Sequence, residues 1–275
     1  MRTFSKKLLV GMLGMLLLFL SGCGNAAKLT VVFPKIGSAD TAVLMTKDAT
    51  VVIDTGESGD AEELLEILSD NHRDTVDLLV ISHYDKDHVG GAAELLEHCT
   101  VKRVIGSTSP KVSDETADYY AALAELGLTE EVLSESLSLE LDGMELTILP
   151  PQEAVYEQDQ SNNSSTVVIV QFGETSMFFA GDAMAERMAE LAPALEGAAF
   201  DLIKVPHHGR DTDTTASLLP CFKTGAAAIV TSSKKEPEDQ SVMDLLATSG
   251  VTVYRTLDGT VTVTSDGTAL KIKQD

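Results

Sequence analysis

The sequence predicts an α/β protein of the αββα sandwich type, in which two mixed β-sheets pack face to face and helices cover their outer sides. Two observations favour this fold class. Short apolar runs rich in β-branched residues are bounded by Gly, Asp or Pro, which is typical of strands. These runs come in groups with helical segments between them, and not in the strict strand–helix alternation of a wound parallel sheet.

The expected elements follow one another without a break. Strands are predicted over residues 29–33, 42–46, 50–54, 78–82, 101–105, 145–149, 166–172, 177–180, 202–205, 227–230, 251–254, 261–264 and 269–272. Helices are predicted over residues 61–70, 92–98, 114–126, 183–191, 214–218 and 241–248. In the first helix Leu64, Leu65 and Leu68 share one face, as expected of a helix that packs on a sheet. No linker or repeat divides the chain after its N-terminal segment, so one domain is expected.

The N-terminal segment has the features of an export signal. Three basic residues precede a Gly-interrupted apolar run over residues 8–20, which is too short to predict a transmembrane helix. Residues 20–23 (LSGC) resemble a bacterial lipobox, which implies cleavage before Cys23 and lipidation of its thiol. We therefore expect a lipoprotein signal peptide over residues 1–23 and a single domain over residues 24–275. The domain would be lipid-anchored on the extracytoplasmic face of a bacterial membrane, with an uncleaved N-terminal anchor as the alternative.

The charge of the chain limits its ligands. The 275 residues include 20 Lys+Arg and 43 Asp+Glu, a net charge of -23, and removal of the first 23 residues brings it to -26. Such a surface repels polyanions, so tight, sequence-independent binding of duplex DNA is disfavoured. A small anionic substrate can still bind where metal ions dominate the local field.

Cysteines do not provide a metal site. The chain has no Cys-x-x-Cys pair and no Cys/His zinc spacing. Cys99 and Cys221 are expected to be two separate buried thiols, with a disulfide between them as the alternative.

The segment over residues 81–91 (ISHYDKDHVGG) carries the clearest chemical signal. It follows an apolar strand and precedes a helix, and His83, Asp85, Asp87 and His88 are all residue types that bind metals. Side chains at the end of a strand can converge on one point. Four such groups are costly to bury without a counter-charge, so convergence on cations is expected.

This segment resembles the metallo-β-lactamase superfamily signature H-x-H-x-D-H, with Asp85 in place of the middle His. The variant H-x-D-x-D-H followed by Gly-Gly is typical of ComEC-type competence hydrolase domains and their free-standing relatives. Further stretches resemble other parts of the same family in the same order, at residues 52–56, 162–168, 179–183, 204–209 and 258–263. The resemblance implies the metallo-β-lactamase fold and a metal-dependent hydrolase with two divalent metal ions.

The resemblance also implies a ligand set. His83 and Asp85 would bind one metal, Asp87 and His88 the second, and Asp182 would bridge both, with a helix N-cap as the alternative role of Asp182. Because Asp85 replaces a His and an Asn/Ser segment stands where relatives have a third His, the first metal has fewer nitrogen ligands. Harder ions gain from this exchange, so Mn²⁺ is expected beside Zn²⁺.

The remaining site residues are expected around this pair of metals. His207 and His208 are neighbours whose side chains should point apart, so one is expected to bind metal and the other to face substrate. His208 is predicted as the last metal ligand and His207 as the proton donor to substrate, with the reverse assignment as the alternative. Asp87 and His207 are the residues expected to be catalytic. Predicted substrate contacts, with the capping of a turn as the alternative, are Asn162, Asn163 and Ser165. Arg210 is interpreted as a surface arginine, with contact to an anionic group as the alternative.

The predicted reaction is hydrolysis by a hydroxide shared between two metals, most simply of a phosphodiester. The acidic surface favours a small or wall-linked phosphodiester, such as a teichoic-acid unit or a nucleotide, over DNA, although a single DNA strand in a locally basic groove remains open. The alternatives are a ComEC-like DNA nuclease, a lactonase or β-lactamase, and a non-catalytic surface binding lipoprotein. No protein partner is evident from the sequence.

Overall fold

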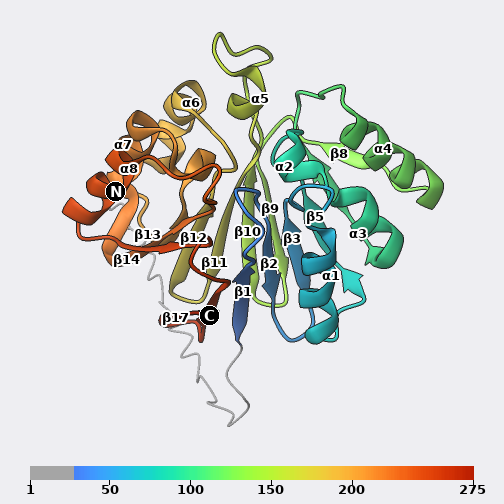
Figure 1. The fold of residues 1–275 in the computed structure, drawn as a ribbon, viewed down its shortest axis with the longest axis horizontal. Coiled ribbons are helices and arrows are strands. Elements are labelled where there is room, and N and C mark those ends of the chain that lie inside the picture. The colour runs from blue at the N-terminus through green and yellow to red at the C-terminus, as the bar shows by residue number, and fades with distance from the viewer. Residues whose placement is uncertain (1–27) are drawn as a thin grey trace, which may run out of the picture.

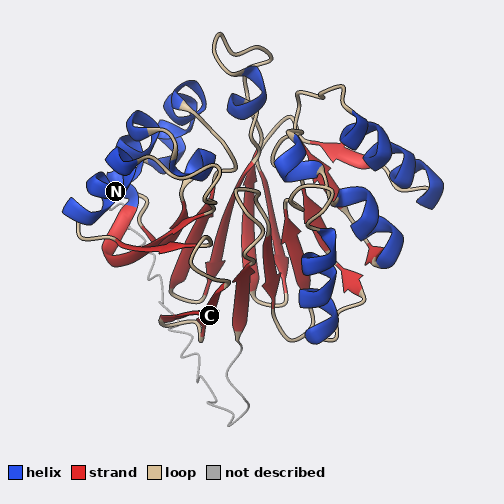
Figure 2. Cartoon of the chain, in the orientation of Figure 1, coloured by secondary structure: helices blue, strands red, loops and turns tan. Residues whose placement is uncertain are grey.

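A computed structural model describes residues 28–275, so the predicted signal peptide and Cys23 lie outside the described residues. Two large sheets stand face to face at the centre, and helices flank them on both outer sides (Figures 1 and 2). The predicted αββα sandwich is therefore confirmed. Within the described part, no helix has the length and apolarity to cross a bilayer.

The first sheet has eight strands. Their order is β17 (Leu270–Gln274), β16 (Val261–Ser265), β1 (Leu29–Phe33), β2 (Ala42–Met45), β3 (Thr50–Ile53), β5 (Leu78–Val80), β7 (Val104–Gly106) and β8 (Glu130–Val132). Strands β17 to β3 pair antiparallel and strands β3 to β8 pair parallel, so the sheet is mixed.

The second sheet has seven strands and is also mixed. Their order is β15 (Thr252–Arg255), β14 (Phe222–Val230), β13 (Phe200–Lys204), β12 (Thr175–Phe179), β11 (Val167–Phe172), β10 (Met144–Leu149) and β9 (Leu137–Leu141). Strands β9 to β12 pair antiparallel and strands β12 to β15 pair parallel. Two short strands, β4 (Thr75–Val76) and β6 (Thr100–Val101), form a separate parallel ladder.

Apolar side chains from both sheets meet in one central core. In β10, Met144, Leu146 and Ile148 point into this core, while Glu145 between them is exposed, as expected of a half-buried strand. A second cluster lies under α1 (Ala61–Asp70), α3 (Ala92–His98) and α4 (Asp114–Leu126). On the other side the outer helices are α6 (Ala185–Leu195), α7 (Thr212–Leu218) and α8 (Gln240–Thr248).

Some predicted boundaries were wrong. The strand predicted over residues 101–105 is two strands, β6 and β7, which belong to different sheets because the chain leaves one ladder for the other at residues 102–103. Strands β8 and β9 were not predicted, although Leu137, Leu139 and Leu141 alternate with polar residues. Cys99 and Cys221 are both free, which confirms two separate thiols, but Cys99 is only half-buried.

The topology gathers the polar loops at one edge of the sandwich. Strands β3, β5 and β7 run parallel in one sheet, and β12, β13 and β14 run parallel in the other. The segments that follow the carboxyl ends of such strands lie at the same edge, which is where α/β proteins commonly bind ligands. The short helices α2 (Lys86–Val89) and α5 (Gln160–Asn163) lie at this edge (Figure 1).

Candidate metal centre

Four of the predicted ligands form one cluster. The ligand atoms of Asp87, His88, Asp182 and His208 all lie within 4.8 Å of one another. Both imidazole Nε2 atoms lie close to Oδ2 of Asp182, at 3.3 Å for His88 and 3.2 Å for His208, and His208 Nε2 lies 3.3 Å from Oδ2 of Asp87. The residues come from segments after β5, β12 and β13, so the two sheets build the cluster together.

The donor atoms of this site fit a divalent cation. Nε2 of His83, His88 and His208 and Oδ1 of Asp182 are buried and have no hydrogen-bond partner among the described residues. The two imidazole nitrogens beside Asp182 are close to its carboxylate but are not aligned for hydrogen bonding. Buried polar atoms are rarely left unpaired, because each costs free energy. Convergence of nitrogen and carboxylate donors suits ions such as Zn²⁺ and Mn²⁺.

His83 and Asp85 lie beside this cluster without joining it. His83 Nε2 lies 4.0 Å from Oδ2 of Asp85, and the His83 ring centroid is 4.1 Å from that of His88. Oδ1 of Asp85 accepts hydrogen bonds from Nζ of Lys111, at 2.7 Å, and from the hydroxyl of Ser161. The position predicted for the first metal is therefore poorer in protein donors than the four-residue cluster.

Burial and charge set the protonation of the imidazoles. Burial lowers the pKa of His83 to about 4, so this imidazole is neutral at neutral pH and has a free lone pair. Burial also disfavours the charged form of His208, but Asp182 and Asp40 outweigh it and raise the pKa to about 10. The same carboxylates that would hold a cation favour protonation of His208, so protons and metal compete for one nitrogen.

Asp54 orients His88. Oδ2 of Asp54 lies 2.9 Å from Nδ1 of His88, on the far side of the ring from the cluster. The backbone N–H of Ser82 donates to Oδ1 of Asp54 and its hydroxyl donates to Oδ2, both at 2.7 Å. This carboxylate–histidine contact is typical of metal sites, where it fixes the ring and its tautomer.

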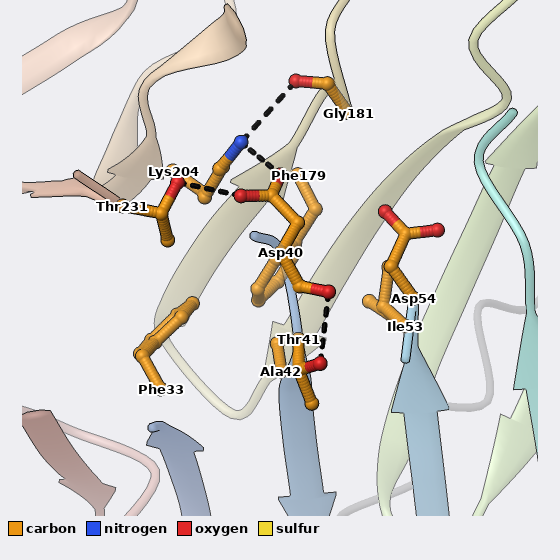
Figure 3. Close-up of a pocket in the computed structure, with 10 residues that line it drawn as sticks. All are labelled: Phe33, Asp40, Thr41, Ala42, Ile53, Asp54, Phe179, Gly181, Lys204 and Thr231. Atoms are coloured by element: carbon orange, nitrogen blue, oxygen red, sulfur yellow. Dashed lines mark hydrogen bonds and ion pairs between the residues drawn. The ribbon is translucent and has the colours of Figure 1, made fainter. Parts of the chain in front are cut away.

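A buried ammonium group, that of Lys204, lies next to the carboxylate of Asp40 (Figure 3). Lys204, which is 4% exposed, forms an ion pair with Asp40, and its Nζ lies 3.8 Å from Oδ1 of Asp182 and 3.4 Å from the carbonyl oxygen of Gly181. Burial would raise the pKa of Asp40, but Lys204 and His208 hold it well below its usual value. Asp40, Gly181 and Lys204 line a small pocket of about 10 Å³, which has room for about one water molecule.

The same network orients His208. The hydroxyl of Thr231 lies 3.0 Å from Nδ1 of His208 and donates to Oδ1 of Asp40 at 2.5 Å. Asp40, Thr231 and the role of Lys204 were not predicted from the sequence. The sequence did offer one signal for Lys204. It is a charged residue directly after Leu202 and Ile203, at the end of a strand predicted to be buried.

The two neighbouring histidines have unusual backbone conformations. His207, His208 and Gly209 all have positive φ, at 48°, 55° and 74°, a region that residues other than Gly rarely adopt. Such strain is concentrated at functional sites. His208 is buried with its Nε2 at the cluster, whereas His207 is half-buried and its Nδ1 has no partner among the described residues. This arrangement is consistent with His208 as ligand and His207 as proton donor.

Asn163 and Ser165 make structural contacts. Oδ1 of Asn163 accepts hydrogen bonds from the backbone N–H groups of Met184, at 3.1 Å, and Arg187, at 3.0 Å. The hydroxyl of Ser165 accepts from the N–H of Asp182 at 3.1 Å. Asn163 thus supports the start of α6, a different place from the turn before residues 166–172 that it was expected to cap as the alternative. Ser165 supports a predicted ligand, and Asn162 is half-buried. Asp182 is not the N-cap of α6, since that position is occupied by Met184.

Comparison with known proteins places this site in a family. A family model described as the metallo-beta-lactamase superfamily matches residues 37–233, which include all six predicted metal ligands. The chain is 26% identical over 183 residues to ComE operon protein 3 of Bacillus subtilis and 27% identical over 198 residues to Recombination protein 2 of Haemophilus influenzae. These matches cover 66% and 70% of the chain but only 23% of each relative.

Among solved structures, the metallo-beta-lactamase fold protein YhfI from Bacillus subtilis is similar in fold. The TM-score is 0.56 at 10% sequence identity, and the similarity covers 89% of this chain and 100% of YhfI. The resemblance to ComEC-type domains stated from the sequence is confirmed by the two relatives above.

Proposed function

Because the chain belongs to the metallo-β-lactamase superfamily, a family of metal-dependent hydrolases, we propose that it is a metal-dependent phosphodiesterase with two divalent cations, Zn²⁺ or Mn²⁺. The observation that carries this proposal is the oxygen-rich donor set. Asp87 and Asp182 belong to the four-residue cluster, and Asp85 lies next to His83 in place of a second imidazole. Carboxylate donors suit harder cations, which are common partners of phosphate groups.

In this proposal Asp87, His88, Asp182 and His208 hold one cation, and His83 and Asp85 face the other. Cations bound there would neutralise charge that develops on the phosphate oxygens and make a water molecule acidic enough to attack near neutral pH. The chain itself orients the ligands, through Asp54 for His88 and through the network of Asp40 and Thr231 for His208.

His207 would complete the reaction. It lies beside His208 with ring centroids 6.2 Å apart, it is half-buried, and Nδ1 is not engaged by the described residues. A protonated imidazole at the edge of the site can give its proton to the leaving alkoxide.

The proposal includes a location. Residues 1–23 would be a lipoprotein signal peptide, and lipidated Cys23 would hold the domain of residues 24–275 on the extracytoplasmic face of the membrane. Metabolic labelling of the chain with radioactive palmitate tests this. Label on the wild type that is lost in Cys23→Ser supports the anchor, and equal labelling of both chains contradicts it.

Hydrolysis of bis(p-nitrophenyl) phosphate by the full chain, with Mn²⁺ or Zn²⁺, tests the activity. Asp87→Ala removes a carboxylate of the cluster and should lower kcat at least about 100-fold. The matched control is Asp244→Ala, an exposed position on α8, which should retain the wild-type rate.

Two outcomes contradict the proposal. One is a folded, metal-loaded chain that hydrolyses no phosphodiester but opens a lactone or a β-lactam. The other is a rate for Asp87→Ala equal to that of the control.

A further inference from the structure

A hollow of about 470 Å³ opens beside the metal-binding cluster. It is lined by residues 36–39 from the segment after β1, by Lys86 of α2 and by residues 233–236 from the segment after β14. Two of these walls continue directly into the cluster region, because Asp40 follows the first and Asp87 follows Lys86. The N–H of Asp40 donates to the carbonyl oxygen of Asp87 at 3.0 Å, which joins the two walls.

The carboxylates of this hollow already have partners. Glu57 forms an ion pair with Lys86 at 2.9 Å, and Asp60 accepts a hydrogen bond from the backbone N–H of Glu57 at 2.9 Å. Glu236 pairs with Arg210 at 3.2 Å. Arg210 therefore contacts the wall of the hollow and neutralises Glu236, as Lys86 neutralises Glu57. Among the described residues of the lining, Asp60 is the carboxylate left to offset the two remaining lysines, so the lysines are in excess.

The ammonium groups of Lys234 and Lys235, two other residues of the lining, form no ion pair among the described residues. Lys234 and Lys235 are exposed, and neither has a carboxylate within 4.0 Å among residues 28–275. The chain has 43 acidic against 20 basic residues, and these two adjacent lysines give the lining of the hollow a local excess of positive charge. A hollow with such residues attracts anions even on an acidic protein.

Among residues 28–275, no aromatic side chain lines the hollow. Recognition of a base by stacking is therefore not supported there, and charge is the available means of recognition. A lysine ammonium binds phosphate as a point charge without demanding one geometry.

We propose that this hollow is a subsite for a second phosphate group of the substrate, next to the phosphodiester that is cleaved at the metal cluster. The substrate class is then a chain of phosphodiesters, and a single isolated diester would leave the subsite empty. This inference rests on the proposed phosphodiesterase function. A nucleotide strand and a glycerol-phosphate chain share the chemistry, because the lysines contact only phosphate.

The test compares substrates with and without a flanking phosphate. The double variant Lys234→Ser/Lys235→Ser is assayed as the full chain on bis(p-nitrophenyl) phosphate, on a tetrathymidylate and on a glycerol-phosphate trimer. The KM of an oligomer that uses the subsite should rise about tenfold, as expected for two exposed charge pairs, with kcat unchanged. The slope of log KM against log salt should fall by about 0.7, as expected for the loss of contact with one phosphate. The KM for bis(p-nitrophenyl) phosphate should not change.

The matched control carries the same change of charge away from the site. Lys47→Ser/Lys271→Ser alters two exposed lysines, one of them in the turn between β2 and β3, at the end of β2 opposite the segment that holds Asp40. It should leave the KM of both oligomers unchanged. The oligomer whose KM rises in Lys234→Ser/Lys235→Ser shows whether the subsite takes a nucleotide strand or a glycerol-phosphate chain.

Binding is measured separately from turnover, by anisotropy of the fluorescein-labelled oligomers on the full chain in EDTA. Weaker binding to the double variant than to the control supports the subsite even if neither oligomer is hydrolysed, in which case only the phosphodiesterase proposal fails. The subsite is overturned if the wild type binds neither oligomer. It is also overturned if both double variants behave alike, or if KM rises equally for bis(p-nitrophenyl) phosphate.

Discussion

Replacing Lys204 by Met removes the counter-ion of Asp40 and leaves that carboxylate buried. Lys204 is 4% exposed and Asp40 is also 4% exposed, so bulk water cannot solvate the carboxylate that loses its ammonium partner. Met is unbranched and one atom shorter than Lys, so the substitution keeps most of the apolar stem and mainly tests the loss of the charge.

The structure allows an estimate of the cost. Breaking a buried ion pair by removing one partner destabilises proteins by about 3–5 kcal/mol. Asp40 keeps two neighbours, the hydroxyl of Thr231 at 2.5 Å and Nδ1 of His208 at 3.3 Å, so we expect about 3 kcal/mol, the lower end of this range. That is a large part of a typical total of about 5–15 kcal/mol.

Urea unfolding of the full chain in EDTA, followed by circular dichroism, measures this free energy. Lys204→Met/Asp40→Asn removes both charges and should recover most of the loss, because the cost arises from the unpaired carboxylate. Lys223→Met is the control for a half-exposed ion pair, since Lys223 pairs with Asp201 at 2.7 Å, and should cost at most about 1 kcal/mol. The reasoning is refuted if Lys204→Met costs no more than Lys223→Met, or if the double variant is as unstable as Lys204→Met.

Further predictions concern the surroundings of the metal cluster. Asp54→Asn should weaken metal binding about 10–100-fold, because His88 loses the carboxylate at Nδ1; titration against a chelator measures this, and an unchanged affinity would contradict the orienting role. Asn163→Ala should destabilise the chain by about 1–3 kcal/mol, because two backbone N–H groups at the start of α6 lose their acceptor, and should leave KM unchanged. A raised KM without loss of stability would instead indicate a substrate contact. Burial raises the pKa of Glu130 more than its three tyrosine donors lower it, so the folded chain holds this proton more tightly than the unfolded chain does. The stability that Glu130 contributes should therefore be greatest below its ordinary pKa of 4.5 and fall as pH rises through the raised value. The difference in unfolding free energy between wild type and Glu130→Gln, taken at pH 4 and pH 7, should show this change, and a difference independent of pH would disprove it.

Much of the fold was predictable because its signals are local. Strands such as β1, β3 and β11 are short apolar runs with clear ends, and helix α1 has its apolar residues on one face. The strand predicted over residues 101–105 shows the limit of such signals. Lys102 and Arg103 interrupt its apolar residues, but a charged pair can also lie within one strand, so the sheet pairing decides that there are two strands.

Most of the predicted metal ligands are also close together in the sequence. His83, Asp85, Asp87 and His88 lie within six positions at the end of one strand, so the sequence by itself determined that they would be close together. It also supplied Asp182 and His208 as residues at the ends of later strands. The sequence alone left open which of two neighbouring histidines is buried, and the backbone after β13 decided for His208.

Only the tertiary structure decided how the charge of the site is balanced. Asp40 and Lys204 are far apart in the sequence and come from different sheets, and each would be an ordinary surface residue on a chain that folded otherwise. Their pairing depends on the stacking of the two sheets, which excludes water from both side chains and makes each the necessary partner of the other. Local sequence patterns carry residue type and spacing, whereas electrostatic compensation depends on distance and burial, which exist only after the sheets have packed.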